Sequence, residues 1–225
     1  MIAGSELSAV LVVGSLCASI LVLAETMHRV FAVEPEWTRK LVHVLMGLTA
    51  AAFPWFFDDP RSVLVICGGF GAILGGSLMR SGLPSVHGVG RRTGGVLWFG
   101  LGVVVVYLAA ESRPDLYVIS ILVLTLADPA AAMVGRRYGA HRFRVGRDAK
   151  TIEGSLAFLL VAFGCLLVAF RVTASLGATE SMVRALAIGA LLAGIEAVSR
   201  AGSDNLTVPL GALFLLRATE ASAHA

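Results

Sequence analysis

The sequence predicts an all-α polytopic membrane protein with seven or eight transmembrane helices. Of the 225 residues, 57% are hydrophobic and 15% are charged, and the mean hydropathy is +0.84. Soluble domains carry about 25% charged residues, so this composition favours a bilayer as the natural solvent. Most of the apolar segments approach the ~20 residues that cross a hydrocarbon core. They lie near 7–24, 41–57, 61–79, 94–110, 115–135, 154–170 and 185–198, with a shorter run at 206–216.

No soluble domain fits between these segments, because the longest gap is the basic loop 136–153. We therefore expect residues 1–225 to form one integral membrane domain. Residues 1–38 would hold the N-terminal helix and the first cytoplasmic loop, and residues 39–216 the functional core. The shortness of 206–216 leaves open whether this run crosses the membrane fully or forms a half-helix.

The first segment is expected to stay in the membrane with its N-terminus outside. Glu6 stands before its apolar run in place of a basic cluster, and the run is too long for a signal peptide. With eight crossings, 13 of the 18 basic residues then fall on inside segments, as the positive-inside rule requires. This bias accounts for the net charge of +3, so no nucleic-acid partner is expected. The inside residues are Arg29, Arg39, Lys40, Arg80, Arg91, Arg92, Arg136, Arg137, Arg142, Arg144, Arg147, Lys150 and Arg200.

Polar residues that interrupt apolar segments indicate a functional site. A charge at the centre of a membrane helix costs ~2.5–3.5 kcal/mol, so such groups usually face a cavity or a partner. Asp128, Glu196, His43 and the pair Asp204-Asn205 stand at or near membrane depth. The predicted topology brings all of them to the inner interface. Two alternatives stay open: Glu196 could pair with Arg200 one turn away, and His43 could be satisfied by a backbone carbonyl.

The pair Asp128-Pro129 predicts a break in the fifth apolar segment. Proline disrupts a continuous helix, whereas Asp at the N-cap followed by Pro at the first helical position suits both residues. Positions 128, 132, 135 and 139 would share a face that reads Asp, Ala, Gly, Gly. Such a face could accept phosphates or a metal. It could equally serve close helix packing, but the six basic residues that follow favour an anion site.

Lysine usage points to the same region. The chain has 16 arginines and two lysines, Lys40 and Lys150, and both lysines fall in inside segments beside the polar groups. A compact ammonium reaches a single phosphate oxygen in a way that a planar guanidinium does not. With only two lysines, coincidence is the competing explanation.

Five motifs in order resemble the membrane lipid-alcohol kinases, a family that includes dolichol kinase, phytol and farnesol kinase, and fungal-type diacylglycerol kinase. The motifs are RKLVHVLMGL, RRTGGVLWFGLG, ADPAAAMVGRRYG, KTIEGSLAF and SDNLTVPL, and they extend from about 39 to 213. The resemblance implies transfer of the terminal phosphate of a nucleoside triphosphate, usually CTP, to a lipid hydroxyl. It also implies Mg²⁺ or another divalent cation.

The resemblance carries functional residues onto matching positions. The family's basic pair falls on Arg39 and Lys40, its aspartate on Asp128 and its glycine on Gly135. Its Lys-x-x-Glu-Gly segment falls on Lys150, Glu153 and Gly154, and its Asp-Asn pair on Asp204 and Asn205. One departure is that Ala127 stands where the family usually has glycine; alanine is small enough that we expect it to be tolerated.

These residues give a predicted active site that faces the cytoplasm, at the plasma membrane if the organism is a prokaryote. We expect catalytic roles for Asp128, Lys150 and Glu153, and magnesium ligation by Asp128 and Asp204. Whether Asp128 binds the metal or acts as a general base stays open. The acceptor would be a membrane lipid alcohol such as phytol, a polyprenol or diacylglycerol. The nucleotide-binding residues would be Arg39, Lys40, His43, Arg92, Gly135, Arg136, Arg137, Gly154 and Asn205.

Two other functions compete with the kinase hypothesis. A phosphatidate cytidylyltransferase also uses CTP and a lipid, but its C-terminal signature with HGG and DRxD is absent from the sequence. A small membrane transporter would place carboxylates along a pathway, yet the two halves of the chain show no matching interrupted helices.

Overall fold

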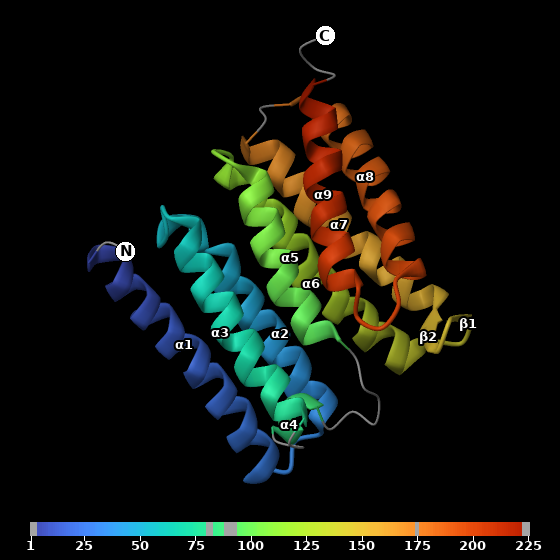
Figure 1. The fold of residues 1–225 in the computed structure, drawn as a ribbon. Coiled ribbons are helices and arrows are strands. Elements are labelled where there is room, and N and C mark those ends of the chain that lie inside the picture. Colours follow the sequence, from blue (N-terminus) through green and yellow to red (C-terminus); the bar gives the residue numbers. More distant parts are fainter. Residues whose placement is uncertain (1–3, 80–82, 88–93, 174–175, 222–225) are drawn as a thin grey trace.

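The computed structural model describes residues 4–79, 83–87, 94–173 and 176–221. The described chain is a bundle of long, roughly antiparallel helices (Figure 1). A short β-hairpin lies at the end of the bundle opposite to the N- and C-termini. The helices are α1 (Gly4–Arg29), α2 (Pro35–Ala51), α3 (Pro60–Met79), α4 (Pro84–His87), α5 (Gly95–Ala110), α6 (Pro114–Tyr138), α7 (Ile152–Thr173), α8 (Ala178–Val198) and α9 (Asp204–Ala221), with a 3₁₀ turn at Phe53–Trp55.

Four helices begin at a proline, namely Pro35, Pro60, Pro84 and Pro114. The fixed φ of proline suits the first turn of a helix, and its missing N–H is one of the groups that would have no intrahelical partner there. The sequence therefore marks the starts of α2, α3, α4 and α6 directly.

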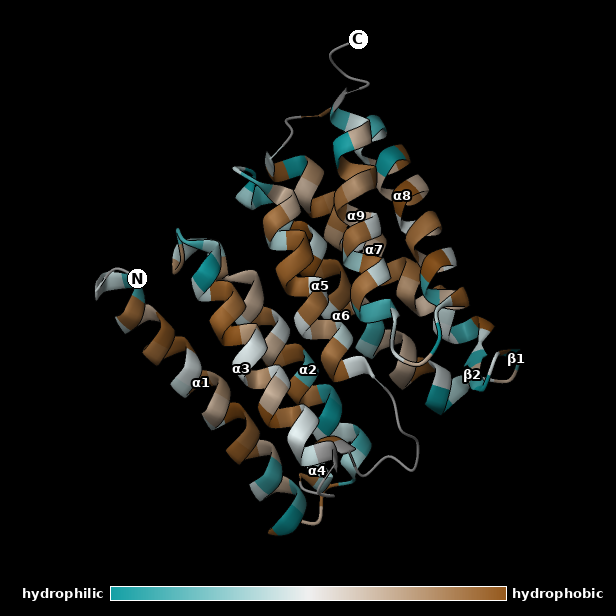
Figure 2. Ribbon diagram, in the orientation of Figure 1, coloured by the Kyte–Doolittle hydropathy of each residue, from teal (hydrophilic) through white to brown (hydrophobic). Residues whose placement is uncertain are grey.

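The predicted class of an all-α polytopic membrane protein is confirmed. Five helices of the described chain are long and apolar enough to cross a bilayer: α1, α3 over Pro60–Ser77, α6, α7 and α8. α5 is also apolar but has only 16 residues. Hydrophobic residues fill the middle of the bundle and hydrophilic ones gather at its ends (Figure 2). The number of seven or eight crossings and the outside N-terminus stay predictions.

Helix α6 is the centre of the fold. It packs against α2, α5, α7 and α9, and Tyr117, Ile121, Leu124 and Ala127 on it are almost fully buried. The hydroxyl of Tyr117 donates a hydrogen bond to the carbonyl of Ala50 on α2, at 2.8 Å. The methyl of Ala127 fits within this core, so the departure from glycine is accommodated by the packing.

The predicted break at Asp128-Pro129 is wrong. α6 runs as one helix from Pro114 to Tyr138 with Pro129 inside it, so Asp128 is not the N-cap of a new helix. An interior proline removes one backbone hydrogen bond and costs ~3 kcal/mol in an isolated helix. Packing from four neighbouring helices holds α6 together in spite of that cost.

Two further segments differ from the simplest expectation. The basic loop 136–153 contains an antiparallel hairpin, β1 (Arg142–Val145) paired with β2 (Asp148–Thr151). Its turn uses Gly146 at φ +63°, a backbone conformation that suits glycine. The short run 206–216 lies within α9, an 18-residue helix that continues through Pro209.

Candidate active site

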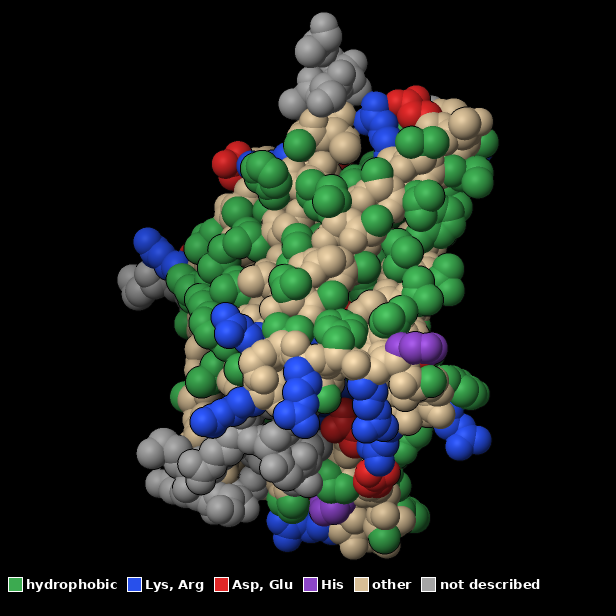
Figure 3. All heavy atoms as spheres, turned by 90° about the vertical axis from the view of Figure 1, so that its right-hand side faces the viewer, with side chains coloured by type: hydrophobic (Ala, Val, Ile, Leu, Met, Phe, Trp, Pro, Cys, Tyr) green, Lys and Arg blue, Asp and Glu red, His purple; other side chains and the backbone are tan. Residues whose placement is uncertain are grey.

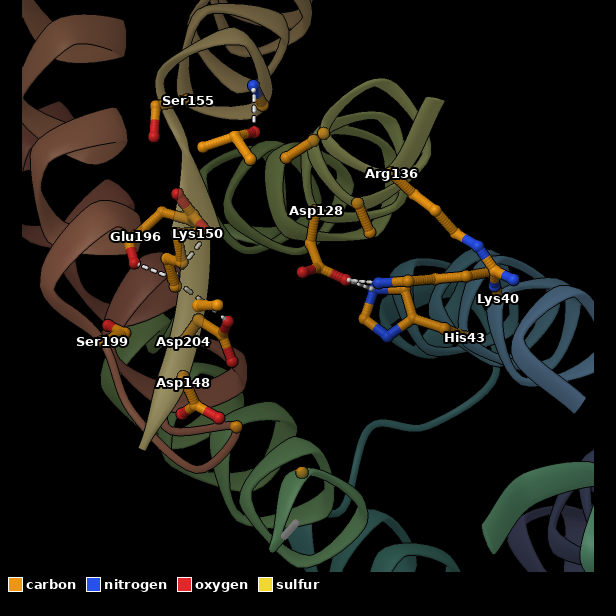
Figure 4. A pocket seen from close by; sticks show the side chains of 18 of the residues that line it. Lys40, His43, Asp128, Arg136, Asp148, Lys150, Ser155, Glu196, Ser199 and Asp204 are labelled. Carbon is orange, nitrogen blue, oxygen red and sulfur yellow. Dashed lines mark hydrogen bonds and ion pairs between the residues drawn. The ribbon is translucent and has the colours of Figure 1, made fainter. Parts of the chain in front are cut away.

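A cavity of about 400 Å³ lies at the hairpin end of the bundle. Its walls come from α2, α6, the hairpin, the start of α7, and the turn between α8 and α9 (Figure 4). Helices α6 and α8 end at this level, and α7 and α9 begin there. Residues that are far apart in the sequence therefore meet around the cavity. The charged and polar side chains that line it are Glu36, Arg39, Lys40, His43, Asp128, Arg136, Arg142, Asp148, Lys150, Thr151, Ser155, Glu196, Ser199, Asp204 and Asn205.

One wall carries a buried ion pair between α2 and α6. The Nζ atom of Lys40 lies 2.7 Å from Oδ2 of Asp128, and only 6% of Lys40 is exposed. The Nε2 atom of His43, one turn further along α2, lies 3.8 Å from the same oxygen. Arg39 is paired with Glu36 at 2.5 Å. Lys40 therefore holds the Asp128 carboxylate in place, since a buried charge needs a charged or hydrogen-bonded partner.

The opposite wall carries a second buried pair. The Nζ atom of Lys150 on β2 lies 2.6 Å from Oε1 of Glu196 on α8, and it also donates to the carbonyl of Glu196. Oδ2 of Asp204 is 4.0 Å from the same ammonium. Glu196 is 6% exposed. Its partner is thus Lys150, and the alternative pairing with Arg200 is wrong.

Polar contacts attach the hairpin to the turn between α8 and α9. Oδ2 of Asp148 accepts a hydrogen bond from the amide of Ala201 at 2.6 Å. The hydroxyl of Thr151 accepts one from the amide of Gly154 at 3.0 Å, which caps the start of α7. These contacts place Lys150 over the cavity.

Glycines let α6 and α7 approach closely beside the cavity. A Cβ atom on Gly135 would lie 2.7 Å from Oγ1 of Thr151 and 3.6 Å from Cα of Gly154. A Cβ on Gly154 would lie 2.9 Å from the carbonyl of Ala131. Gly135 and Gly154 also line the cavity. The small residues on this face of α6 therefore do two things: they allow close helix packing, and they line the cavity.

Most of the predicted site residues meet in this cavity. Arg39, Lys40, His43, Asp128, Gly135, Arg136, Lys150, Gly154, Asp204 and Asn205 all line it. Glu153 and Arg137 do not. Glu153 accepts hydrogen bonds from the amide and Nδ1 of His141, and the guanidinium of Arg137 lies over the ring of Tyr138. Arg92 lies outside the described residues.

Several cavity residues were not assigned by sequence reasoning. Glu196 had a clear signal, a carboxylate at membrane depth, but the motifs that carry the family resemblance do not include it. Asp148 and Ser199 carry no signal that separates them from ordinary loop or helix residues, whereas Arg142 belongs to the basic loop and Ser155 to the motif KTIEGSLAF, without an assigned role for either. Their position depends on the hairpin and on the helix ends that surround it.

Unpartnered buried atoms mark the cavity as a place for a ligand. Among the described residues, four buried side-chain nitrogen or oxygen atoms have no hydrogen-bond partner, and three of them belong to this cavity. These three are Nε2 of His43, Oγ of Ser155 and Oδ1 of Asn205. Buried polar atoms are nearly always satisfied in folded proteins, so a bound molecule is expected to complete them.

The donor set suits Mg²⁺ only together with a substrate. Across the described chain, no three acidic, His or Cys side chains lie close enough to form a metal cage. Asp128 and Asp204 line the cavity from opposite walls. Mg²⁺ is commonly bound by one or two carboxylates plus phosphate oxygens and water, which this arrangement can provide.

The surface around the cavity has the charge expected for an anionic ligand next to a membrane. Figure 3 shows a broad apolar surface over the helices and a group of Lys and Arg side chains at one end, around a small acidic patch. Arg136, on the cavity rim, forms an ion pair with Glu34 and is half exposed.

The chain is similar to two known kinases. The chain is 34% identical over 201 residues to the phytol kinase of Synechocystis sp., covering 88% of this chain and 85% of that protein. It is 30% identical over 158 residues to CTP-dependent diacylglycerol kinase 1 of Saccharomyces cerevisiae, covering 62% of this chain and 51% of the yeast protein. No family model matches the chain. No solved structure matches it either.

Proposed function

The chain belongs to the membrane lipid kinase family of phytol kinase and CTP-dependent diacylglycerol kinase, and from this premise we propose that it transfers the terminal phosphate of CTP to the hydroxyl of a prenyl alcohol such as phytol. The greater identity and coverage with the phytol kinase supports the prenyl acceptor over diacylglycerol. The name of the yeast relative supports CTP as the donor.

The observation that carries the proposal is the pair of buried lysine–carboxylate contacts on opposite walls of one cavity. Lys40 with Asp128, and Lys150 with Glu196, place two ammonium groups and their acids around a single space. Phosphoryl transfer depends mainly on positioning and on neutralising the charge of the transferring group. Two lysines fixed from two sides can do both for a triphosphate.

The remaining cations extend this role. Arg39, Arg136 and Arg142 line the cavity near the aqueous end of the bundle, where the diphosphate part of the nucleotide would lie. One guanidinium group can donate two parallel hydrogen bonds to the oxygens of a phosphate, which orients the nucleotide. The hydroxyl oxygen of the acceptor would then attack the terminal phosphorus in line and lose its proton to a carboxylate of the cavity, while the electron pair of the broken P–O bond would leave with CDP.

Asp128 and Asp204 are the residues that would hold Mg²⁺. When bound, the ion would neutralise charge on the phosphate oxygens. Lys40 holds the Asp128 carboxylate beside this position, and Asp204 is set at the first residue of α9 by the preceding turn. Catalytic or nucleotide-binding roles for Glu153 and Arg137 stay predictions, because both side chains point to other partners.

The position of the cavity suits both substrates. The middle of the helix bundle is apolar (Figure 2), and basic side chains gather at the end of the bundle where the cavity lies (Figure 3). A lipid alcohol would arrive within the bilayer and CTP from the aqueous phase, which we propose is the cytoplasm.

The test uses purified protein in lipid nanodiscs with CTP or ATP labelled at the terminal phosphate. Phytol, a long polyprenol and diacylglycerol serve as acceptors. We expect label in phytol with CTP as donor, and its loss in Asp128→Asn. A protein that releases pyrophosphate with phosphatidate, and labels no alcohol, would instead be a cytidylyltransferase. Absence of both reactions in a folded protein would refute an enzymatic function of this kind.

A further inference from the structure

The imidazole of His43 occupies a different part of the cavity from the residues suited to phosphate. It lies on α2 with a side chain only 12% exposed, turned toward Asp128 (Figure 4). It also meets Phe99 of α5 edge to face, with ring centroids 5.6 Å apart. His43 therefore lies beside both the Lys40–Asp128 ion pair and an apolar ring.

The hydrogen bonding of the ring leaves one nitrogen free. Nε2 of His43 is buried and has no hydrogen-bond partner among the described residues. In the neutral tautomer that carries its proton on Nδ1, Nε2 is an acceptor. In that tautomer His43 offers a lone pair to a hydrogen-bond donor that the described chain does not supply.

The neighbouring carboxylate is already engaged. Oδ2 of Asp128 lies 2.7 Å from the Lys40 ammonium, while Nε2 of His43 is 3.8 Å from the same oxygen, too far for a hydrogen bond. A small donor that fits beside both groups would complete Nε2. A hydroxyl is such a donor, and a phosphate ester without a proton is not.

The surroundings favour an alcohol with a hydrocarbon chain. Phe99, Met46 and Phe70, from α5, α2 and α3, are partly buried and pack against the same apolar core. The opposite wall carries Lys150, Asp204 and Asn205 and is polar. The hydroxyl would enter at the apolar side, and the nucleotide at the polar side.

We infer that His43 and Phe99 form the subsite for the acceptor alcohol, with the alcohol hydroxyl donating a hydrogen bond to Nε2 of His43. This inference rests on the proposed function, which it deepens by naming where the acceptor binds. It assigns His43 to the lipid alcohol, whereas the sequence alone grouped it with the nucleotide-binding residues. Asp128 would then pair with Lys40 and bind the metal. Of the two roles that the sequence left open for Asp128, metal ligand and general base, this selects the metal ligand.

The test compares two substitutions of different reach. In His43→Gln the side-chain amide reaches the position of Nε2, whereas in His43→Asn it reaches only that of Nδ1. In nanodiscs, we expect His43→Asn to raise the KM for phytol about tenfold or more, as for a buried hydrogen bond left unmade. His43→Gln should recover most of this loss. The Kd for CTP, measured without alcohol, should be unchanged in both variants. Phe99→Ala should also raise the KM for phytol without affecting CTP binding.

His28 provides a matched control. It lies on α1, and its Nδ1 contacts the backbone carbonyl of Val33 at 2.9 Å, but it does not line the cavity. His28→Asn should leave the KM for phytol unchanged. If His43→Asn unfolds the protein, His43→Gln and Phe99→Ala carry the comparison.

The outcomes separate the inference from the proposed function. A weaker Kd for CTP with an unchanged KM for phytol in the His43 variants would overturn the inference and return His43 to the nucleotide. Unchanged values for both substrates would also overturn it. If the wild-type protein transferred no phosphate to any alcohol, the proposed function would fail first, and this subsite with it.

Discussion

Removal of the charge on Glu196 tests whether the second ion pair supports the fold as well as the site. The change is Glu196→Gln, which keeps the size of the side chain and one acceptor oxygen. Lys150 then loses a carboxylate at 2.6 Å and keeps Asp204 at 4.0 Å. Its side chain is 14% exposed and that of Glu196 is 8% exposed, so solvent replaces little of the lost interaction.

The expected magnitude follows from this burial. Removing one partner of a buried ion pair typically costs ~3–5 kcal/mol. The lower end, ~3 kcal/mol, applies here because Asp204 and the Gln oxygen remain near the ammonium. For a chain of this length each kcal/mol lowers Tm by ~2–4 °C, so the expected fall in Tm is ~6–12 °C.

The assay is thermal unfolding in nanodiscs followed by tryptophan fluorescence, with phosphate transfer measured on the same samples. Glu180→Gln is the matched control, because Glu180 lies on the same helix and pairs with Arg184 at 2.5 Å, but its side chain is 48% exposed. An exposed pair of this kind contributes ~0–1 kcal/mol, so its Tm should change by no more than ~4 °C.

A second variant checks the pairing itself. Lys150→Met removes the ammonium and leaves Glu196 as a buried charge, so it should also lower Tm. The combination Lys150→Met with Glu196→Gln should recover most of the lost stability, because no uncompensated charge remains. It should not recover transfer, since Lys150 would no longer meet phosphate. Equal Tm values for Glu196→Gln and Glu180→Gln, or no recovery in the double variant, would refute this account.

Three further predictions concern other parts of the structure. Gly135→Ala should lower both stability and transfer, because its Cβ would meet Oγ1 of Thr151 at 2.7 Å; Thr151→Ala in the same chain should relieve the clash, and Tm values of both variants check this. Glu6→Gln should lower Tm, because it weakens the hydrogen bonds that Glu6 accepts from Ser62 and the amide of Asp59 at the other end of the bundle. The loss of one charge-assisted contact is expected to cost ~1–3 kcal/mol of stability. A changed KM for either substrate would contradict this prediction. Removing divalent cations with EDTA should abolish transfer, and Mg²⁺ should restore it; full transfer in EDTA would argue against metal ligation by Asp128 and Asp204.

The sequence by itself determined the membrane class of the fold, the starts of several helices and most residues of the candidate site. Hydropathy depends on the residues of each segment alone, and Pro35, Pro60, Pro84 and Pro114 act on their own turns. The two lysines were informative for a similar reason: a lysine in a chain that otherwise uses arginine stands out without any knowledge of its neighbours.

Only the tertiary structure decided which residues meet. Lys40 and Asp128 are 88 positions apart, and Lys150 and Glu196 are 46 apart. Local spacing offered Arg200 as the partner of Glu196, but the hairpin brings Lys150 to it instead. Local propensity also predicted a break at Pro129, which the packing of four helices around α6 overrides. Pairings and interrupted helices depend on free energies shared between distant segments, and no single segment of the sequence contains that information.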